Sequence, residues 1–140
     1  MFLGVFLFTV LILFYGFILS TEILSRTFPQ GKEFFAKVDQ AVGKDSTKVI
    51  LAIGGIFGGI WNFFAPDFGT DITIIGALIP SVILIIDGTI LYPNIINLLN
   101  IPQEKKDQYF AFIEKYKGIA GVITIISGFM HMFLFKVILF

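Results

Sequence analysis

Hydrophobic residues form four long runs, and the segments between the runs hold most of the charged residues. The runs are residues 2–24, 49–65, 72–92 and 118–140, of which the second is the shortest. Because a helix needs about 20 mainly apolar residues to cross a bilayer, each run is a candidate transmembrane helix. The pattern therefore predicts an all-α integral membrane protein: a single membrane domain over residues 1–140, with four transmembrane helices in an antiparallel bundle.

The segment between the first two runs has the periodicity of an amphipathic helix over about residues 31–43. Its apolar residues share one helical face, whereas Lys32, Lys37 and Asp39 lie away from that face. The apolar residues are Phe34, Val38, Ala41 and Val42. Helices of this kind lie in the plane of the membrane surface, so we expect a short interfacial helix here.

A second helix is predicted outside the bilayer, over about residues 102–117. Pro102 and Glu104 are typical of a helix start. Aromatic and apolar residues then recur on one face, and they are Tyr109, Phe112, Ile113 and Tyr116. We expect a cytoplasmic helical extension that leads into the fourth run, with a helix break at Gly118 as the alternative.

The basic residues give an expected orientation. Nine of the ten Lys and Arg residues fall within the segments 25–48 and 93–117, and the exception is Lys136. Loops rich in Lys and Arg tend to stay in the cytoplasm. We therefore expect both loops to be cytoplasmic and both termini to face outward, in a multi-pass protein of the bacterial inner-membrane type.

The overall composition agrees with a membrane protein and narrows its chemistry. The chain is 56% hydrophobic with a mean hydropathy of +0.92, and 14% of its residues are charged. Soluble domains carry about 25% charged residues. The net charge of zero gives no reason to expect a nucleic-acid partner. The absence of cysteine excludes disulfides, thiolate nucleophiles and cysteine metal sites.

The second run contains two glycine pairs in the sequence "ILAIGGIFGGIWNFF", residues 50–64. Each glycine weakens a helix in water by about 1 kcal/mol, but in a bilayer the backbone must bond internally and stays helical. Glycines four residues apart make a flat face for close helix contact, either within the monomer or in a homodimer. We expect Gly58→Leu to disrupt the fold or the assembly and Phe57→Leu to be tolerated.

Small residues also share one face in the third and fourth runs. The expected helix-packing residues are Gly54, Gly55, Gly58, Gly59, Gly76, Pro80, Gly121 and Gly128. The most polar deep residues of these runs, Asn62, Asp87 and His131, lie on the same faces, which predicts that they point into the bundle. The first run has a weaker small-residue stripe, so we expect its helix to be peripheral.

Asp87 and His131 are the ionisable residues that we expect deepest in the membrane. Asp87 is placed about 7–8 Å inside the cytoplasmic boundary, where an acid is costly and is by default a functional hypothesis. The alternative is a buried acid that pairs with Lys117, with Arg26 or with a helix end. His131 could be a packing residue, a proton relay or a cofactor ligand.

The two ionisable residues are expected about 12 Å apart along the membrane normal, too far for a direct hydrogen bond. Small hydroxyl side chains lie between them in depth. The candidate intramembrane polar or ion path is Asp87, His131, Asn62, Ser127 and Ser81. Small polar residues are also the ordinary means of holding membrane helices together, which is the alternative interpretation.

The sequence contains no phosphate-binding loop, metalloprotease motif or nucleophile elbow. We therefore expect no catalytic residues, no metal or cofactor site and no enzymatic activity. Glu22 is expected to pair with Arg26, four residues later.

The function expected from these features is that of a non-catalytic accessory, anchoring or assembly subunit that acts through helix packing. Its expected partners are the lipid bilayer and another membrane protein or further copies of itself. The alternative is a small oligomeric ion or proton transporter or channel that uses Asp87 and His131. A holin-like or immunity-like protein and a membrane enzyme rank below these two.

Overall fold

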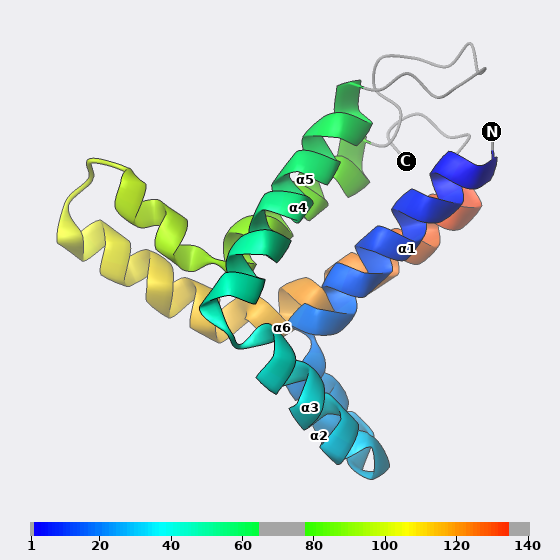
Figure 1. Cartoon of the computed structure of the whole chain (residues 1–140), viewed down its shortest axis with the longest axis horizontal. Coiled ribbons are helices and arrows are strands. Elements are labelled where there is room, and N and C mark those ends of the chain that lie inside the picture. The colour runs from blue at the N-terminus through cyan, green and yellow to red at the C-terminus, as the bar shows by residue number, and fades with distance from the viewer. Residues whose placement is uncertain (1, 65–77, 135–140) are drawn as a thin grey trace.

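The computed structural model describes residues 2–64 and 78–134, and over these residues it is all-helical, in agreement with the predicted class. The elements are α1 (Phe2–Leu19), α2 (Thr21–Thr27), η1 (Pro29–Gly31), α3 (Lys32–Val42), α4 (Asp45–Phe64), α5 (Leu78–Leu91), η2 (Pro93–Leu98) and α6 (Gln103–Leu134). Figure 1 shows their arrangement. The predicted packing residue Gly76 lies outside the described residues.

Two of the described helices are long and apolar enough to cross a membrane, namely α4 over Asp45–Phe63 and α6 over Gln103–Leu134. Counting α1 and α2 together as one bent span would make three. The described part of α5, Leu78–Leu91, is apolar but shorter. The described residues thus support membrane-spanning helices without reaching the four predicted spans.

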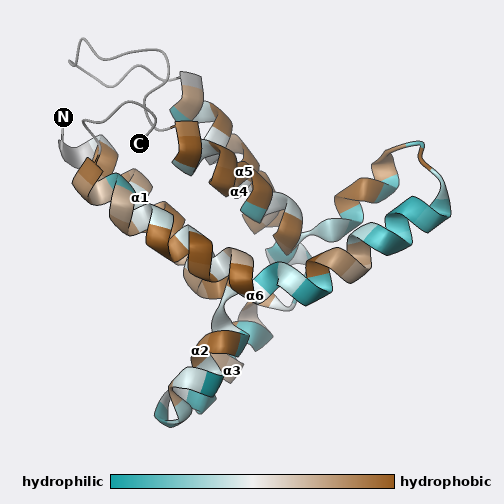
Figure 2. Ribbon diagram, turned by 180° about the vertical axis from the view of Figure 1, so that it is seen from behind, coloured by the Kyte–Doolittle hydropathy of each residue, from teal (hydrophilic) through white to brown (hydrophobic). Residues whose placement is uncertain are grey.

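The long helices form two antiparallel pairs, α1 with α6 and α4 with α5. The pairs contact each other mainly through α5, which packs against both α6 and α1. Figure 2 shows hydrophobic residues along both pairs, whereas α2, α3 and the first half of α6 carry most of the hydrophilic ones. The predicted separation of apolar spans from polar connecting segments is therefore visible in the fold.

The sequence pattern predicts one straight helix over residues 2–24, and this prediction is wrong. The chain bends by 72° between α1 and α2. Ser20 lies at the break with φ −96° and ψ 6°, and its Oγ donates a hydrogen bond to the carbonyl of Gly16 at 2.7 Å. A serine hydroxyl that bonds back to the preceding turn favours bending, which explains why hydropathy alone placed the end of this helix too late.

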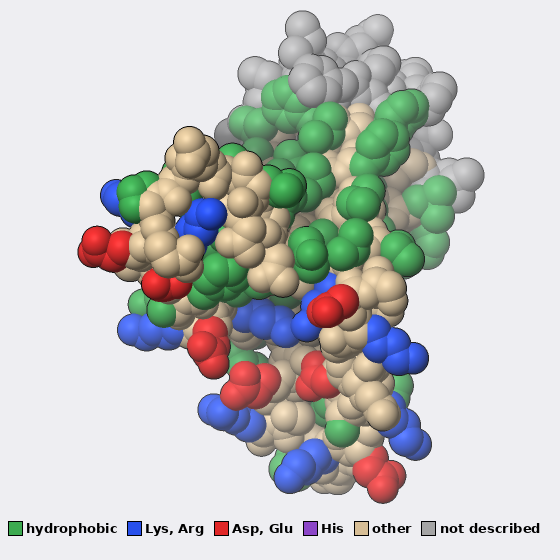
Figure 3. All heavy atoms as spheres, turned by 60° about the vertical axis from the view of Figure 1, so that its left-hand side comes forward, with side chains coloured by type: hydrophobic (Ala, Val, Ile, Leu, Met, Phe, Trp, Pro, Cys, Tyr) green, Lys and Arg blue, Asp and Glu red, His purple; other side chains and the backbone are tan. Residues whose placement is uncertain are grey.

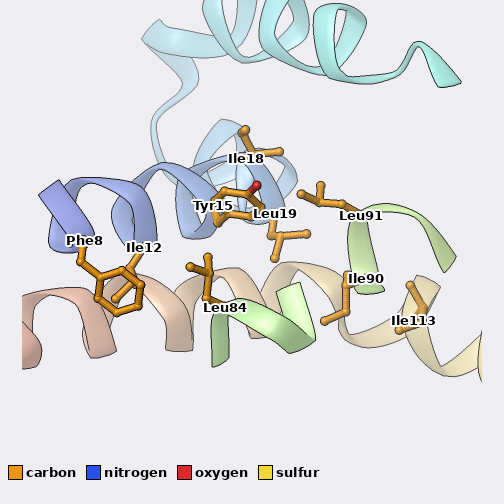
Figure 4. Packing of buried hydrophobic residues seen from close by; sticks show 9 residues of the cluster. All are labelled: Phe8, Ile12, Tyr15, Ile18, Leu19, Leu84, Ile90, Leu91 and Ile113. Atoms are coloured by element: carbon orange, nitrogen blue, oxygen red, sulfur yellow. The ribbon is translucent and has the colours of Figure 1, made fainter. Parts of the chain in front are cut away.

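The expectation that the first helix is peripheral is also wrong. Figure 4 shows Ile12, Tyr15 and Leu19 of α1 in the main hydrophobic cluster, opposite Leu84 of α5. The remaining members of the cluster shown there are Phe8, Ile18, Ile90, Leu91 and Ile113. Ile12 has no exposed surface at all. The helix with the weakest small-residue stripe therefore lies at the centre of the core.

The α1–α6 pair makes its closest approach at Gly16 and Gly121. A Cβ atom on Gly16 would lie 2.9 Å from the carbonyl oxygen of Gly121, and one on Gly121 would lie 2.7 Å from the carbonyl oxygen of Gly16. Both distances are shorter than a Cβ can tolerate, so each helix needs glycine where the other crosses it. Further along α6, a Cβ on Gly128 would meet side-chain atoms of Leu13 and Ile12.

The α4–α5 pair has a backbone contact of the same kind, at Gly55, Gly59 and Gly88. A Cβ on Gly59 would lie 2.6 Å from the carbonyl oxygen of Ser81, and one on Gly55 would lie 3.2 Å from Cα of Gly88. Pro80 is buried on the same helix, one residue before Ser81. These two helices therefore meet backbone to backbone.

The other two glycines of α4 have different neighbours. A Cβ on Gly54 would lie 3.1 Å from Oη of Tyr15, and one on Gly58 would lie 3.1 Å from Cδ2 of Leu11, both on α1. Gly54 itself is exposed. The four glycines that share a predicted face thus contact both neighbours: Gly59 lies against α5, Gly54 lies against α1, and Gly55 and Gly58 lie against both helices.

The last helix, α6, continues through Gly118 without a break, from Gln103 to Leu134. Figure 1 shows that it changes direction along its length, and that its first part extends away from the two helix pairs. Tyr109 in this first part donates a hydrogen bond to the carbonyl of Thr89 on α5, at 3.4 Å. The helical extension expected before the fourth run is therefore the beginning of one long helix.

We predict that Gly59→Leu destabilises the protein by about 1–3 kcal/mol, because the new side chain would collide with the α5 backbone. The matched control is Phe57→Leu on the outer face of α4, where the phenylalanine is 63% exposed; its effect should stay within about 0.5 kcal/mol. Gly58→Leu should fall between them, since Gly58 faces flexible leucine side chains. Thermal unfolding in detergent measures all three, and a Gly59→Leu protein as stable as Phe57→Leu would contradict the contact.

Candidate functional site

Several polar side chains are buried inside the structure although most of the helices around them are apolar. Among the described residues, those with less than a tenth of their surface exposed are Thr9, Ser20, Thr21, Ser81, Asp87, Thr124, Ser127 and His131. Polar groups inside an apolar interior are costly unless they are hydrogen-bonded, and an ionisable one in a membrane segment points to function.

Four helices contribute polar groups to one region, which we call the polar junction. It consists of Tyr15 of α1, the Leu51 carbonyl of α4, Asp87 of α5 and Thr124 of α6. Thr124 Oγ1 donates to Asp87 Oδ1 at 3.1 Å, and Asp87 is only 1% exposed. Tyr15 Oη donates to the Leu51 carbonyl at 2.5 Å and lies within electrostatic reach of Asp87. Two hydrogen bonds of the junction therefore connect the helix pairs, one from α1 to α4 and one from α6 to α5.

Three buried oxygen atoms near this interior have no hydrogen-bond partner among the described residues: Oδ2 of Asp87, Oγ of Ser127 and Oγ1 of Thr9. Leaving such an atom unsatisfied costs about 1–3 kcal/mol, and more for a charged group. Asp87 forms no salt bridge with a described residue, whereas Arg26 pairs with Glu22 at 2.6 Å, as expected from their spacing. The alternative in which Asp87 is neutralised by Arg26 or Lys117 is therefore wrong.

The other residues of the predicted path divide into two groups. Asn62 donates through Nδ2 to Ser81 Oγ at 3.1 Å, a contact that joins α4 to α5. Ser127 and His131 lie on the buried face of α6 that also carries Thr124. His131 packs edge-on against the ring of Phe8 on α1, with 5.5 Å between ring centroids.

The structure places His131 well away from Asp87 along the bundle. Asp87 bonds to Thr124, and His131 is seven residues further along α6, which corresponds to about 10 Å. Over residues 2–64 and 78–134, no group of three or more His, Cys, Asp or Glu side chains is placed to hold a metal ion. The chemistry that this arrangement offers is hydrogen bonding and proton transfer around a single carboxyl group.

Sequence reasoning missed Tyr15, and it left Thr9 and Thr124 out of the candidate path. Tyr15 lies in the middle of an apolar run. A hydroxyl donor at such a position needs a buried partner, which was an available signal. Its partner could not be identified, because the Leu51 carbonyl is a backbone group that any sequence supplies.

We predict that Tyr15→Phe lowers the free energy of unfolding by about 0.5–1.5 kcal/mol, since it removes the donor to the Leu51 carbonyl and keeps the ring. Tyr116→Phe is the control, because Tyr116 is an exposed residue on the first part of α6. Unfolding titrations in mixed micelles would measure both changes. Equal stabilities of the two variants would show that the hydroxyl contributes nothing to the polar junction.

Comparison with known proteins identifies the chain only at the level of a family. No curated protein and no solved structure matches it. A protein-family model matches residues 1–131, a range that contains the whole polar junction and reaches His131. No function is described for that family. The chain thus belongs to a protein family of unknown function that extends over residues 1–131.

Proposed function

We propose that the protein is a multi-pass membrane protein of the bacterial inner-membrane type, with four spanning helices in an antiparallel bundle and both termini outside. The long apolar helices, their antiparallel pairing and the glycine contacts between them support this arrangement. Segments 25–48 and 93–117 are cytoplasmic, because they hold nine of the ten basic residues. Within this membrane domain the protein acts as a non-catalytic assembly or anchoring subunit.

The observation that carries the assembly role is an exposed aromatic pair on the first half of α6. The rings of Phe112 and Tyr116 lie 4.7 Å apart between centroids, and the two residues are 58% and 37% exposed. The neighbouring Ile113 is buried, and Tyr109 packs against the hydrophobic core. Only half of the aromatic face predicted from the sequence is therefore used inside the molecule.

The surroundings of this pair favour a protein partner. Figure 3 shows Lys, Arg, Asp and Glu side chains gathered toward one end of the molecule, while hydrophobic side chains cover much of the rest of the described surface on this face. The pair lies on a helical segment with many charged residues, and Lys115 Nζ is 5.1 Å from the Tyr116 ring. Aromatic residues are enriched at the centres of protein interfaces. The partner we infer is a cytoplasmic segment of another membrane protein.

The α2–α3 hairpin provides the second part of the role, attachment to the membrane surface. Thr21 Oγ1 donates to Asp39 Oδ1 at 2.6 Å, and Phe35 packs on Phe17 with ring centroids 5.9 Å apart. Phe28 and Phe34 remain exposed on the same hairpin. Exposed phenylalanines beside lysines suit the boundary between headgroups and acyl chains.

The proposed topology can be tested with single cysteines, since the chain has none of its own. Lys44→Cys and Lys106→Cys should react with a membrane-impermeant maleimide in inside-out vesicles and be protected in right-side-out vesicles. Asp67 lies between the second and third predicted spans, outside the described residues, and Asp67→Cys should show the reverse. Labelling of Lys44→Cys and Lys106→Cys from opposite sides would overturn the proposed topology.

The assembly role can be tested by replacing Phe112 with a photo-crosslinking phenylalanine analogue in living cells. Irradiation should give one discrete adduct that disappears when Tyr116→Ala is added. The same analogue at Phe57, which is 63% exposed on a spanning helix, is the control and should give no discrete protein adduct. An adduct with twice the chain mass of 15.6 kDa would show that the partner is another copy of this chain and not a second protein. Identical results at the two positions would remove the proposal.

A further inference from the structure

Helix packing alone does not account for the unsatisfied oxygen atoms around Asp87. A membrane protein can hold its helices together with hydroxyl groups that bond to neighbouring carbonyls, as Ser20 does with Gly16 at 2.7 Å. Asp87 Oδ2, Ser127 Oγ and Thr9 Oγ1 make no such bonds within the described structure, although all three are buried. A purely structural role would be better served by apolar side chains of similar size.

Two of these atoms belong to the paired helices α1 and α6, and the third, on Asp87 of α5, lies beside α6. Thr124 bonds to Asp87, and Ser127 comes three residues later on the buried face of α6, about 4–5 Å further along the helix. Thr9 is next to Phe8, which packs on His131, so it lies about one turn beyond Ser127. The line starts at the only buried carboxyl group of the described residues and continues through hydroxyl groups.

We propose that Asp87 is the proton-binding group of an intramembrane proton path that runs along the α1–α6 contact past Ser127 and Thr9. The carboxylate takes up a proton at Oδ2, where the new O–H bond forms, and becomes a neutral acid. On release this bond breaks and the electron pair stays on Oδ2. The proton binds a hydroxyl oxygen in the line while that hydroxyl passes its own proton on to the next oxygen, so each hydroxyl stays neutral. No oxidant, reductant or other reactant is required.

The surroundings of Asp87 favour a proton over an alkali-metal ion. Sodium and potassium ions need several converging oxygen ligands, whereas the hydrogen-bond partner of Asp87 is Thr124. On α1, the titratable group that interacts with Asp87 is Tyr15. The Leu51 carbonyl of α4 accepts the hydrogen bond from Tyr15. His131 of α6 lies about 10 Å away along the helix. The carboxyl group thus has no fixed cation next to it among the described residues.

Labelling with dicyclohexylcarbodiimide tests whether Asp87 binds a proton in an apolar environment, because this hydrophobic reagent adds to protonated carboxyl groups. The full chain in detergent should gain one adduct, which peptide mass spectrometry should place on Asp87. Asp87→Asn should gain none, and exposed Glu22 should stay unmodified. Failure of Asp87 to react would overturn the proposal. Protection of Asp87 by 100 mM sodium or potassium ions, at constant ionic strength, would show that Asp87 binds an alkali ion and would overturn the proposal of a proton.

Proton flux tests the path itself. Proteoliposomes that contain a pH-sensitive dye and carry a potassium diffusion potential should acidify at least tenfold faster with the wild-type protein than with Asp87→Asn. Ser127→Ala should slow the flux several-fold. Ser20→Ala is the matched control and should leave the flux unchanged, since its hydroxyl already bonds to Gly16. A wild-type flux equal to that of Asp87→Asn would overturn the path.

Misfolding of Asp87→Asn and a wrong membrane topology can each be distinguished from failure of the proton path. If Asp87→Asn does not fold, carbodiimide-treated wild-type protein takes its place: it should keep its elution volume in gel filtration and lose the flux, and retention of the flux would overturn the path. The inference rests on the proposed membrane-spanning arrangement, which the cysteine-labelling experiment checks separately. It is independent of the Phe112 partner, because its readouts use the purified chain alone.

Discussion

The approach of helix backbones at glycines is the constraint on which the rest of the structure depends. α1 and α6 meet at Gly16 and Gly121, and α4 and α5 meet at Gly55 and Gly88, with no room for a Cβ atom at the tightest points. Lipid provides no hydrophobic force between helices, so dispersion contacts at these short distances must hold each pair together. The same short distances bring side chains within reach of partners on neighbouring helices. A larger residue at the α4–α5 crossing would separate Asn62 from Ser81, which bond to each other across these two helices.

Close packing also explains why the buried oxygen atoms matter. Where helices are pressed together, a polar atom either finds a partner on the neighbouring helix or remains unsatisfied at a cost of about 1–3 kcal/mol. Asn62 and Ser81 satisfy each other across the α4–α5 contact. Asp87 Oδ2 and Ser127 Oγ remain unsatisfied at the contact between α5, α6 and α1. The interior around Asp87 therefore differs from the α4–α5 contact, because its buried oxygen atoms lack hydrogen-bond partners among the described residues.

The sequence was sufficient for the helical class, because that class depends on local patterns. It could not identify which helix each α4 glycine contacts, since a helical wheel gives a direction but not the identity of the neighbour. The bend at Ser20 was hidden because the hydrophobic run continues past it to residue 24. The closest approach of α1 to α6 is at Gly16, whose importance arises from the glycine opposite it on α6.

One helix carries parts of both proposed roles, and its length keeps the roles separable. The first half of α6 presents Phe112 at the molecular surface, and the second half brings Thr124 to Asp87. These positions are twelve residues apart, which corresponds to about 18 Å along a continuous helix. Substitutions that far apart, with no shared contact, act nearly independently. Loss of a partner at Phe112 and loss of proton flux at Asp87 would therefore report on different properties of the same chain.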